Sequence, residues 1–77
     1  MTRVIVTNDA MARAIFETRK AYGLSQIELA ERAGLHEKHV YLCEKGRTAI
    51  TIRTLVRCDK VLGGELIAKL IKGEDDE

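Results

Sequence analysis

The sequence predicts an all-α domain of five short helices, and three observations carry this prediction. Apolar residues recur at spacings of three and four along most of the chain, which is the period of an amphipathic helix. Side chains that cap helices stand at the beginnings of several segments, and no proline interrupts them. Glycines divide the chain into segments of helical length: Gly23, Gly34, Gly46, Gly63, Gly64 and Gly73.

The first predicted helix begins at Asn8 or Asp9, either of which can cap it, and it ends near Tyr22. Gly23 follows as its stop, because glycine adopts the left-handed conformation that ends helices without strain. Apolar and small residues at helical spacing predict its buried face: Met11, Ala14, Ile15, Thr18 and Tyr22.

The second predicted helix begins with a capping box. Ser25 is the cap, and the side chain of Glu28, three residues later, can reach back to it. Gly34 ends this helix in the left-handed conformation. A tight Ala-Gly-Leu turn leads into the next helix, and two short helices joined in this way have the layout of a helix-turn-helix.

The third predicted helix begins after His36, which caps it less well than serine or threonine would. Val40 and Cys43 form its inner side, and Gly46 closes it. In a helix-turn-helix this helix lies in the DNA major groove while the helix before it crosses the backbone. The pattern therefore indicates a DNA-binding function.

Two further helices complete the prediction. Thr51 caps a helix that runs to Leu62, and its candidate core residues are Ile52, Leu55, Val56, Cys58, Val61 and Leu62. Residues 65–72 form the last helix. Its apolar residues lie at helical spacing: Leu66, Ile67, Leu70 and Ile71. We expect this apolar face to contact a second copy of the chain, although core packing alone would account for part of it.

The chain divides into an N-terminal arm or strand at residues 1–8, a helical domain at 9–73 and an acidic tail at 74–77. Residues 3–7 are β-branched and few, which favours a strand over a helix. A lone strand needs a partner, and a second copy of the chain would supply one in a two-stranded ribbon. A disordered arm is the alternative of equal weight.

Charge and cysteine content narrow the class of protein. The formal net charge is +1, but the last four residues are all acidic. Without them 13 basic residues face 8 acidic ones, so the body of the chain is moderately basic, at +5. The two cysteines are widely spaced, as expected for free thiols in a reducing cytoplasm. No stretch is apolar enough for a signal peptide or a membrane span, so we expect a cytoplasmic protein.

A spaced pattern runs through most of the chain: Arg19-Lys20-x-x-Gly23-Leu24-Ser25-Gln26-x-x-Leu29-Ala30-x-x-Ala33-Gly34-Leu35, then Val40-x-x-x-Glu44-x-Gly46, then Thr51-Ile52-x-x-Leu55, and Leu62-Gly63. Over residues 13–66 it resembles the Cro/C1-type (XRE) helix-turn-helix family of bacterial and phage repressors. The resemblance implies a five-helix, lambda-repressor-like domain that binds DNA. Two positions depart from the family pattern, which often has serine or threonine at His36 and commonly proline at Ile50.

Subfamilies share parts of this pattern. The short β-branched segment before the first helix is similar to that of HipB-type antitoxins. The loop at residues 46–55 and the compact last helix are similar to those of restriction–modification controller proteins. The sequence does not separate these subfamilies.

The resemblance implies which side chains face DNA bases. It places them on the third helix: Glu37, Lys38, His39, Tyr41 and Leu42. Lysine can donate to guanine O6 and N7, glutamate can accept from cytosine N4, and leucine can touch a thymine methyl. Glu37 also has a purely structural explanation, because a carboxylate complements the dipole at a helix N-terminus.

Phosphate contacts are expected from a second set of residues: Arg19, Gln26, Lys45 and Arg47. Gln26 stands at the N-terminus of the second helix, where free backbone amides form an anion site. Arg19 has an alternative role, because in the family this arginine pairs with a glutamate inside the domain, which here is Glu44. That glutamate would then orient Arg19 rather than meet DNA.

Metal binding and catalysis are disfavoured. His39 and Cys43 lie four residues apart on one helix face, but zinc needs about four ligands and the sequence offers no second cluster. A cysteine–histidine nucleophile pair would need a substrate pocket, which nothing in the sequence suggests. We therefore expect no enzyme, no metal and no cofactor.

Together these observations predict a homodimeric, sequence-specific DNA-binding regulator, a repressor acting on a near-palindromic operator. A chain of 77 residues builds only a small core, so a second subunit would add stability. The rival prediction is a protein-interaction module on the same fold, an antitoxin or anti-activator that binds a toxin or an activator protein. The near-neutral total charge, the acidic tail and Glu37 would suit such a module.

Overall fold

Five α-helices follow one another along residues 6–72, the part of the chain that the computed structural model describes. They are α1 (Asn8–Ala21), α2 (Gln26–Ala33), α3 (Glu37–Glu44), α4 (Ile52–Val61) and α5 (Glu65–Lys72). No strand occurs between residues 6 and 72, and the all-α prediction is confirmed. Most of the predicted strand at residues 3–7 and the whole acidic tail at 74–77 lie outside the described residues. Val6 and Thr7, which are described, belong to neither a helix nor a strand.

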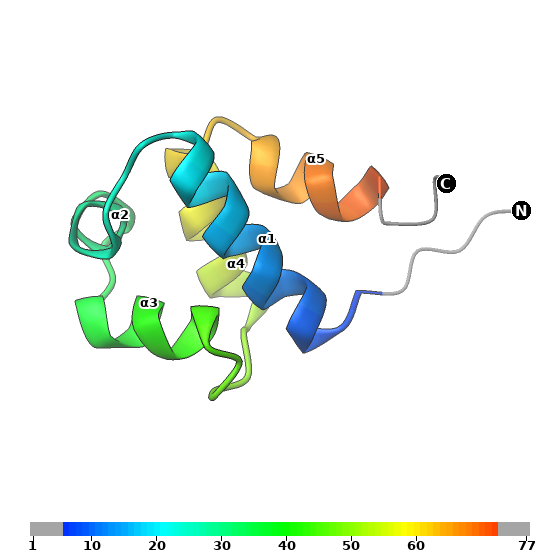
Figure 1. The fold of residues 1–77 in the computed structure, drawn as a ribbon, viewed down its shortest axis with the longest axis horizontal. Coiled ribbons are helices and arrows are strands. Elements are labelled where there is room, and N and C mark those ends of the chain that lie inside the picture. Colours follow the sequence, from blue (N-terminus) through cyan, green and yellow to red (C-terminus); the bar gives the residue numbers. More distant parts are fainter. Residues whose placement is uncertain (1–5, 73–77) are drawn as a thin grey trace, which may run out of the picture.

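The helices form two groups that share one core. Figure 1 shows α1 running across the middle of the molecule in front of α4, with α5 alongside at one end and α2 and α3 at the other. The helix α5 packs on α1 and α4, while α2 packs on α3 and α4. As a result, α3 lies at the edge of the domain with one side on the core and the other open.

The helix starts follow the predicted caps in three cases. In α2, Ser25 Oγ accepts from the Glu28 N–H at 3.0 Å and Glu28 Oε1 accepts from the Ser25 N–H at 2.8 Å, which completes the capping box. The hydrogen bond from the Ser25 backbone holds the pKa of Glu28 below its ordinary value. His36 Nδ1 accepts from the Lys38 N–H at the start of α3, and the Thr51 hydroxyl caps α4.

The cap of α1 was wrongly predicted. Thr7, one residue before the expected Asn8 or Asp9, accepts the Ala10 N–H through its hydroxyl at 3.0 Å. Asn8 is the first helical residue instead, and its side chain is bonded to the loop between α3 and α4. The hydroxyl of Thr7 therefore does the capping, and the amide of Asn8 serves a long-range contact.

One apolar core connects all five helices. Its members come from every helix, from the loop before α4 and from the turn after it: Ala12, Ala14, Ile15, Leu29, Ala30, Val40, Cys43, Ile50, Leu55, Cys58, Leu62, Leu66 and Leu70. Most predicted core positions are confirmed, with three exceptions. Tyr22 is 45% exposed because its ring lies over Gly63 at the surface. Ile52 and Val56 are exposed because they line an open groove instead of the core.

None of the helices between residues 6 and 72 has the length and apolar character needed to cross a lipid bilayer.

Candidate nucleic-acid interface

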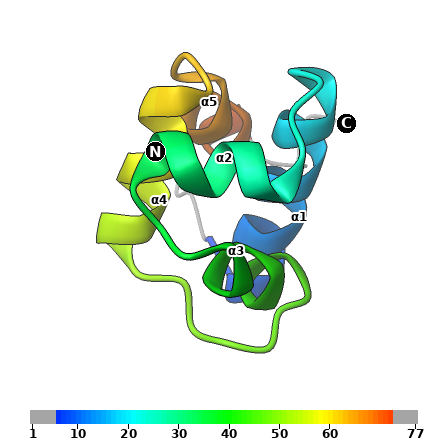
Figure 2. The ribbon, with the colours of Figure 1, turned by 90° about the vertical axis from the view of Figure 1, so that its left-hand side faces the viewer.

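The turn between α2 and α3 is stabilised by a backbone hydrogen bond within it and by a side chain of α4. Gly34 ends α2 with a φ of +72°, and the Leu35 N–H donates to the Ala30 carbonyl at 2.8 Å. From outside, Arg57 of α4 approaches the carbonyl oxygens of Ala33 and Gly34 at 3.5 and 3.4 Å. Figure 2 shows the result, with α2 and α3 side by side on one face of the molecule.

The helix α3 has a buried side and an open side. Val40 and Cys43 are 2% and 1% exposed and pack into the core, as predicted. Glu37, Lys38 and Tyr41 are exposed on the surface. This division leaves three of the five predicted base-contacting side chains accessible to a large ligand such as duplex DNA.

His39 and Leu42 are less exposed than these three. The Nε2 atom of His39 lies 3.2 Å from the Thr54 hydroxyl and 3.7 Å from the sulfur of Cys43. The ring of His39 is therefore engaged with α4 and with its own helix, although the resemblance placed it on the DNA face. Leu42 is half-buried, so part of its side chain is accessible.

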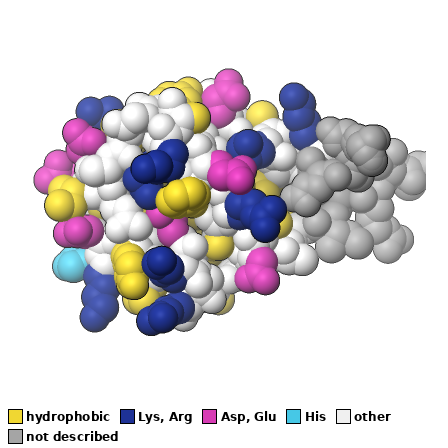
Figure 3. Space-filling model, viewed as in Figure 1, with side chains coloured by type: hydrophobic (Ala, Val, Ile, Leu, Met, Phe, Trp, Pro, Cys, Tyr) yellow, Lys and Arg dark blue, Asp and Glu magenta, His cyan; other side chains and the backbone are white. Residues whose placement is uncertain are grey.

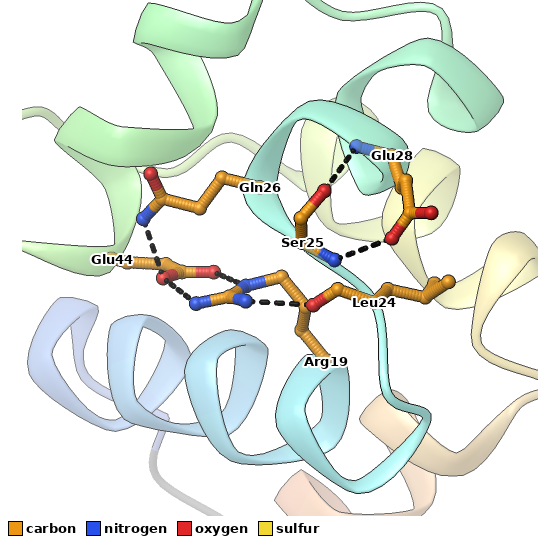
Figure 4. A network of polar contacts seen from close by, with 6 residues as sticks. All are labelled: Arg19, Leu24, Ser25, Gln26, Glu28 and Glu44. Atoms are coloured by element: carbon orange, nitrogen blue, oxygen red, sulfur yellow. Dashed lines mark hydrogen bonds and ion pairs between the residues drawn. The ribbon is translucent and has the colours of Figure 1, made fainter.

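Arg19 of α1 is buried and pairs with Glu44, the last residue of α3 (Figure 4). Its Nε and Nη2 atoms donate to the two carboxylate oxygens of Glu44 at 2.6 and 2.9 Å, and its Nη1 donates to the Leu24 carbonyl at 2.8 Å. The hydrogen bonds that Arg19 donates to Glu44 raise the pKa of Arg19 above its ordinary value, although burial opposes this. The structure contains the Arg19–Glu44 pair, which the resemblance offered as the alternative to a phosphate contact.

Gln26 joins the same network from the first turn of α2. Its Nε2 donates to Oε1 of Glu44 at 2.9 Å, so Glu44 contacts both α1 and α2 (Figure 4). The amide nitrogen of Gln26 carries two hydrogens, so one N–H remains for a phosphate while the other bonds to Glu44. A phosphate at the start of α2 would also meet the backbone amides there.

Two cations follow directly after α3. Lys45 and Arg47 are both exposed, and the ammonium of Lys45 lies 5.8 Å from the centre of the Tyr41 ring. In Figure 3, Lys and Arg side chains gather over α3 at the lower left, while Asp and Glu side chains lie along the edge over α2. The open side of α3 is thus flanked by positive charge at its C-terminal end.

Neither cysteine has the surroundings of a reactive thiol. Cys43 and Cys58 are both buried free thiols, and burial raises the pKa of Cys43 and raises that of Cys58 to about 12. Among residues 6–72, no three His, Cys, Asp or Glu side chains form a group that could hold a metal ion. The thiols are part of the core.

The predicted dimer contacts on α5 divide between core and surface. Leu66 is fully buried and Leu70 is 9% exposed, so both belong mainly to the core, whereas Ile71 is 62% exposed. Ile67 is half-buried. An open groove of about 310 Å³ runs beside α5 and is lined by apolar side chains only: Val6, Met11, Ile52, Leu55, Val56, Ile67, Leu70 and Ile71.

Sequence reasoning missed two side chains that shape this surface. Asn8 bonds to Thr48 and Ile50, and Arg57 bonds to the end of α2. Both contacts join residues more than twenty positions apart, and no local pattern signals them. The Gln26 bond to Glu44 was also missed, although helical spacing does place Glu44 at the inner end of α3.

Comparison with known proteins agrees with this geometry. A family model described as helix-turn-helix matches residues 15–74. A protein from Methanothermobacter thermautotrophicus is 36% identical over 66 residues, which cover 86% of this chain and 96% of that protein. It bears the name of an uncharacterized HTH-type transcriptional regulator. The chain belongs to the Cro/C1-type (XRE) helix-turn-helix family.

Proposed function

We propose that this protein is a sequence-specific DNA-binding transcription regulator, a repressor that binds a near-palindromic operator as a homodimer. One observation carries the proposal. The side of α3 away from the core is open and ends beside two exposed cations, Lys45 and Arg47. The name of the relative from M. thermautotrophicus supports a role in transcription.

In this proposal the first turn of α3 reads bases. Lys38 donates to the O6 and N7 atoms of a guanine, and Glu37 accepts from the N4 amine of a cytosine. Leu42 and Tyr41 supply the apolar contacts next to them. His39 contacts Thr54 of α4 and so helps to position α3. It affects base recognition only through the position of that helix.

Backbone contacts fix the register of the protein on the duplex. Lys45, Arg47 and the backbone amides at the start of α2 contact phosphates. Arg19 and Glu44 do not touch DNA but hold the ends of α2 and α3 together. The resemblance implied a related role, in which Glu44 orients Arg19.

The homodimer uses the apolar groove beside α5. Ile52 and Ile71 are 71% and 62% exposed, and Val6 and Val56 add further apolar surface at 40% and 37%. Such a contiguous apolar patch marks an interaction site. In a two-fold interface the same patch of each copy meets its equivalent, and two copies present two α3 helices to one operator.

The experiment is a titration of labelled DNA from directly upstream of the protein's own gene, followed by fluorescence anisotropy at several salt concentrations. Lys38→Ala is expected to weaken binding to that DNA by about ten- to hundredfold while binding to unrelated DNA changes less, because a base contact carries specificity. Arg47→Ala is expected to weaken both and to lower the salt slope by about 0.9.

Lys60→Ala is the matched control, because it removes the same charge from the far end of α4. It is expected to leave the specific affinity close to that of the wild type. Absence of wild-type binding at low salt would contradict the DNA-binding function and favour the rival protein-interaction module. Wild-type binding that neither Lys38→Ala nor Arg47→Ala weakens would contradict the assignment of residues alone.

A further inference from the structure

Asn8, the first residue of α1, bonds to the loop that follows α3. Its Nδ2 donates to the Thr48 carbonyl at 3.1 Å, and its Oδ1 accepts from the Ile50 N–H at 2.8 Å. The side-chain amide of Asn8 thus bonds to a backbone carbonyl and a backbone N–H of the loop, the same groups that a neighbouring β-strand would bond to. We propose that Asn8 is a positioning residue that fixes this loop so that Arg47 reaches a DNA phosphate, a role that rests on the proposed function.

The other end of the same loop is fixed by α3 itself. Gly46 adopts a φ of +69°, and its N–H donates to the Cys43 carbonyl at 3.1 Å. The Arg47 N–H donates to the Leu42 carbonyl at 2.9 Å. These bonds have the pattern of a Schellman motif, which satisfies the last carbonyls of a helix.

Arg47 therefore lies between two fixed points. On its N-terminal side the backbone is bonded to α3, and on its C-terminal side the next residue, Thr48, is bonded to Asn8. Two residues further on, the side chain of Ile50 is 6% exposed and packs into the core. The side chain of Arg47 is exposed and carries the charge of this segment.

An amide side chain suits the position of Asn8, because it carries both a donor and an acceptor. An aspartate could accept from Ile50 but would present a carboxylate, with no donor, to the carbonyl of Thr48. The start of α1 does not require Asn8, because the Thr7 hydroxyl already caps that helix. The amide is thus available for the loop, and substituting it leaves the cap in place.

The test compares Asn8→Ala, Arg47→Ala and the double variant by DNA titration over a range of salt concentrations. Asn8→Ala is expected to weaken binding several-fold and to lower the salt slope by about 0.9, as Arg47→Ala does, because each removes the same phosphate contact. The double variant is expected to bind no more weakly than Arg47→Ala, since the two side chains act through one contact. Amide hydrogen exchange at Ile50 is expected to be faster in Asn8→Ala than in the wild type.

Asp59→Ala is the matched control. Asp59 Oδ1 accepts from the Ile67 N–H at 2.9 Å, so this variant also removes one side-chain acceptor from one backbone amide, but at the junction of α4 and α5. It should lose a similar amount of thermal stability and keep the wild-type salt slope. If loss of stability by itself changed the salt slope of DNA binding, Asp59→Ala would show the same change.

Two results would overturn the proposal. If Asn8→Ala keeps the wild-type salt slope, or if its loss of affinity adds to that of Arg47→Ala, Asn8 does not act through Arg47. Failure of the wild type to bind DNA would instead overturn the proposed function and, with it, the role of Asn8. The first outcome leaves DNA binding intact, so the two failures are distinguishable.

Discussion

Glu44 accepts hydrogen bonds from Arg19 of α1 and from Gln26 of α2, so three helices meet at one carboxylate. The side chains of Arg19 and Glu44 are 8% and 3% exposed, which places the ion pair almost entirely out of water. Charges in such a place depend on each other, because neither is hydrated by solvent. At the residue scale, this buried ion pair therefore helps to fix the position of α2 relative to α3.

Glu44→Ala is expected to lower the free energy of unfolding by about 3 kcal/mol, since it leaves Arg19 buried without its partner. Urea denaturation followed by circular dichroism would measure the loss. Glu17→Ala is the control, because the Glu17–Lys69 pair is longer, at 3.5 Å, and both side chains are 48% exposed. Its expected cost is at most about 1 kcal/mol. Equal losses in the two variants would contradict the structural importance of the buried pair.

At the scale of elements, the turn between α2 and α3 depends on one glycine and one arginine. A Cβ at Gly34 would lie 3.0 Å from Nη1 of Arg57, the atom that approaches the last carbonyls of α2. Gly23, which ends α1, has a similar φ of +70° but no atom near the position of its missing Cβ. Alanine substitutions at the two glycines therefore distinguish the cost of backbone strain from the cost of crowding.

Gly23→Ala is expected to cost about 1–2 kcal/mol, the strain of a left-handed alanine. Gly34→Ala should cost more, because the new methyl group also displaces the guanidinium of Arg57. In an Arg57→Ala background the excess cost of Gly34→Ala should disappear. Chemical denaturation of the four variants measures these differences, and an excess that persists without Arg57 would show that crowding comes from elsewhere.

The sequence predicted the helices and the helix-turn-helix because the signals for them are local. Ser25 and Glu28 are three residues apart, and Gly34 acts on its own helix. Contacts such as those of Asn8 and Arg57 join distant segments, so no spacing rule finds them. The exposure of Ile52 was not predictable either, because helical periodicity gives the apolar face of a helix but not the element that covers it.

The whole molecule presents two surfaces with different chemistry. One is the open side of α3 with its cations, and the other is the apolar groove beside α5. The core between them is small, so apolar surface buried between two copies would add to the stability of each. At this scale, oligomeric state and stability are expected to change together.

Ile71→Lys is expected to convert the protein to a monomer, since it places a charge in the apolar groove. Sedimentation velocity at tens of micromolar protein would measure this, and the wild-type unfolding temperature should rise with concentration while that of Ile71→Lys should not. Ile27→Lys is the control, because Ile27 is 49% exposed on α2, outside the groove. A wild type that sediments as a monomer would contradict the dimer.

The hydrogen bonds of Asn8 have a consequence for communication between these surfaces. Val6 lines the groove two residues before Asn8, and Ile52 lines it two residues after Ile50. The Asn8 side chain therefore ties together two short stretches, each of which reaches from the groove to the loop that carries Arg47. If a second copy binds in the groove and DNA binds at Arg47, a shift of Asn8 that accompanies one event reaches the other site, and any such coupling is equal in both directions.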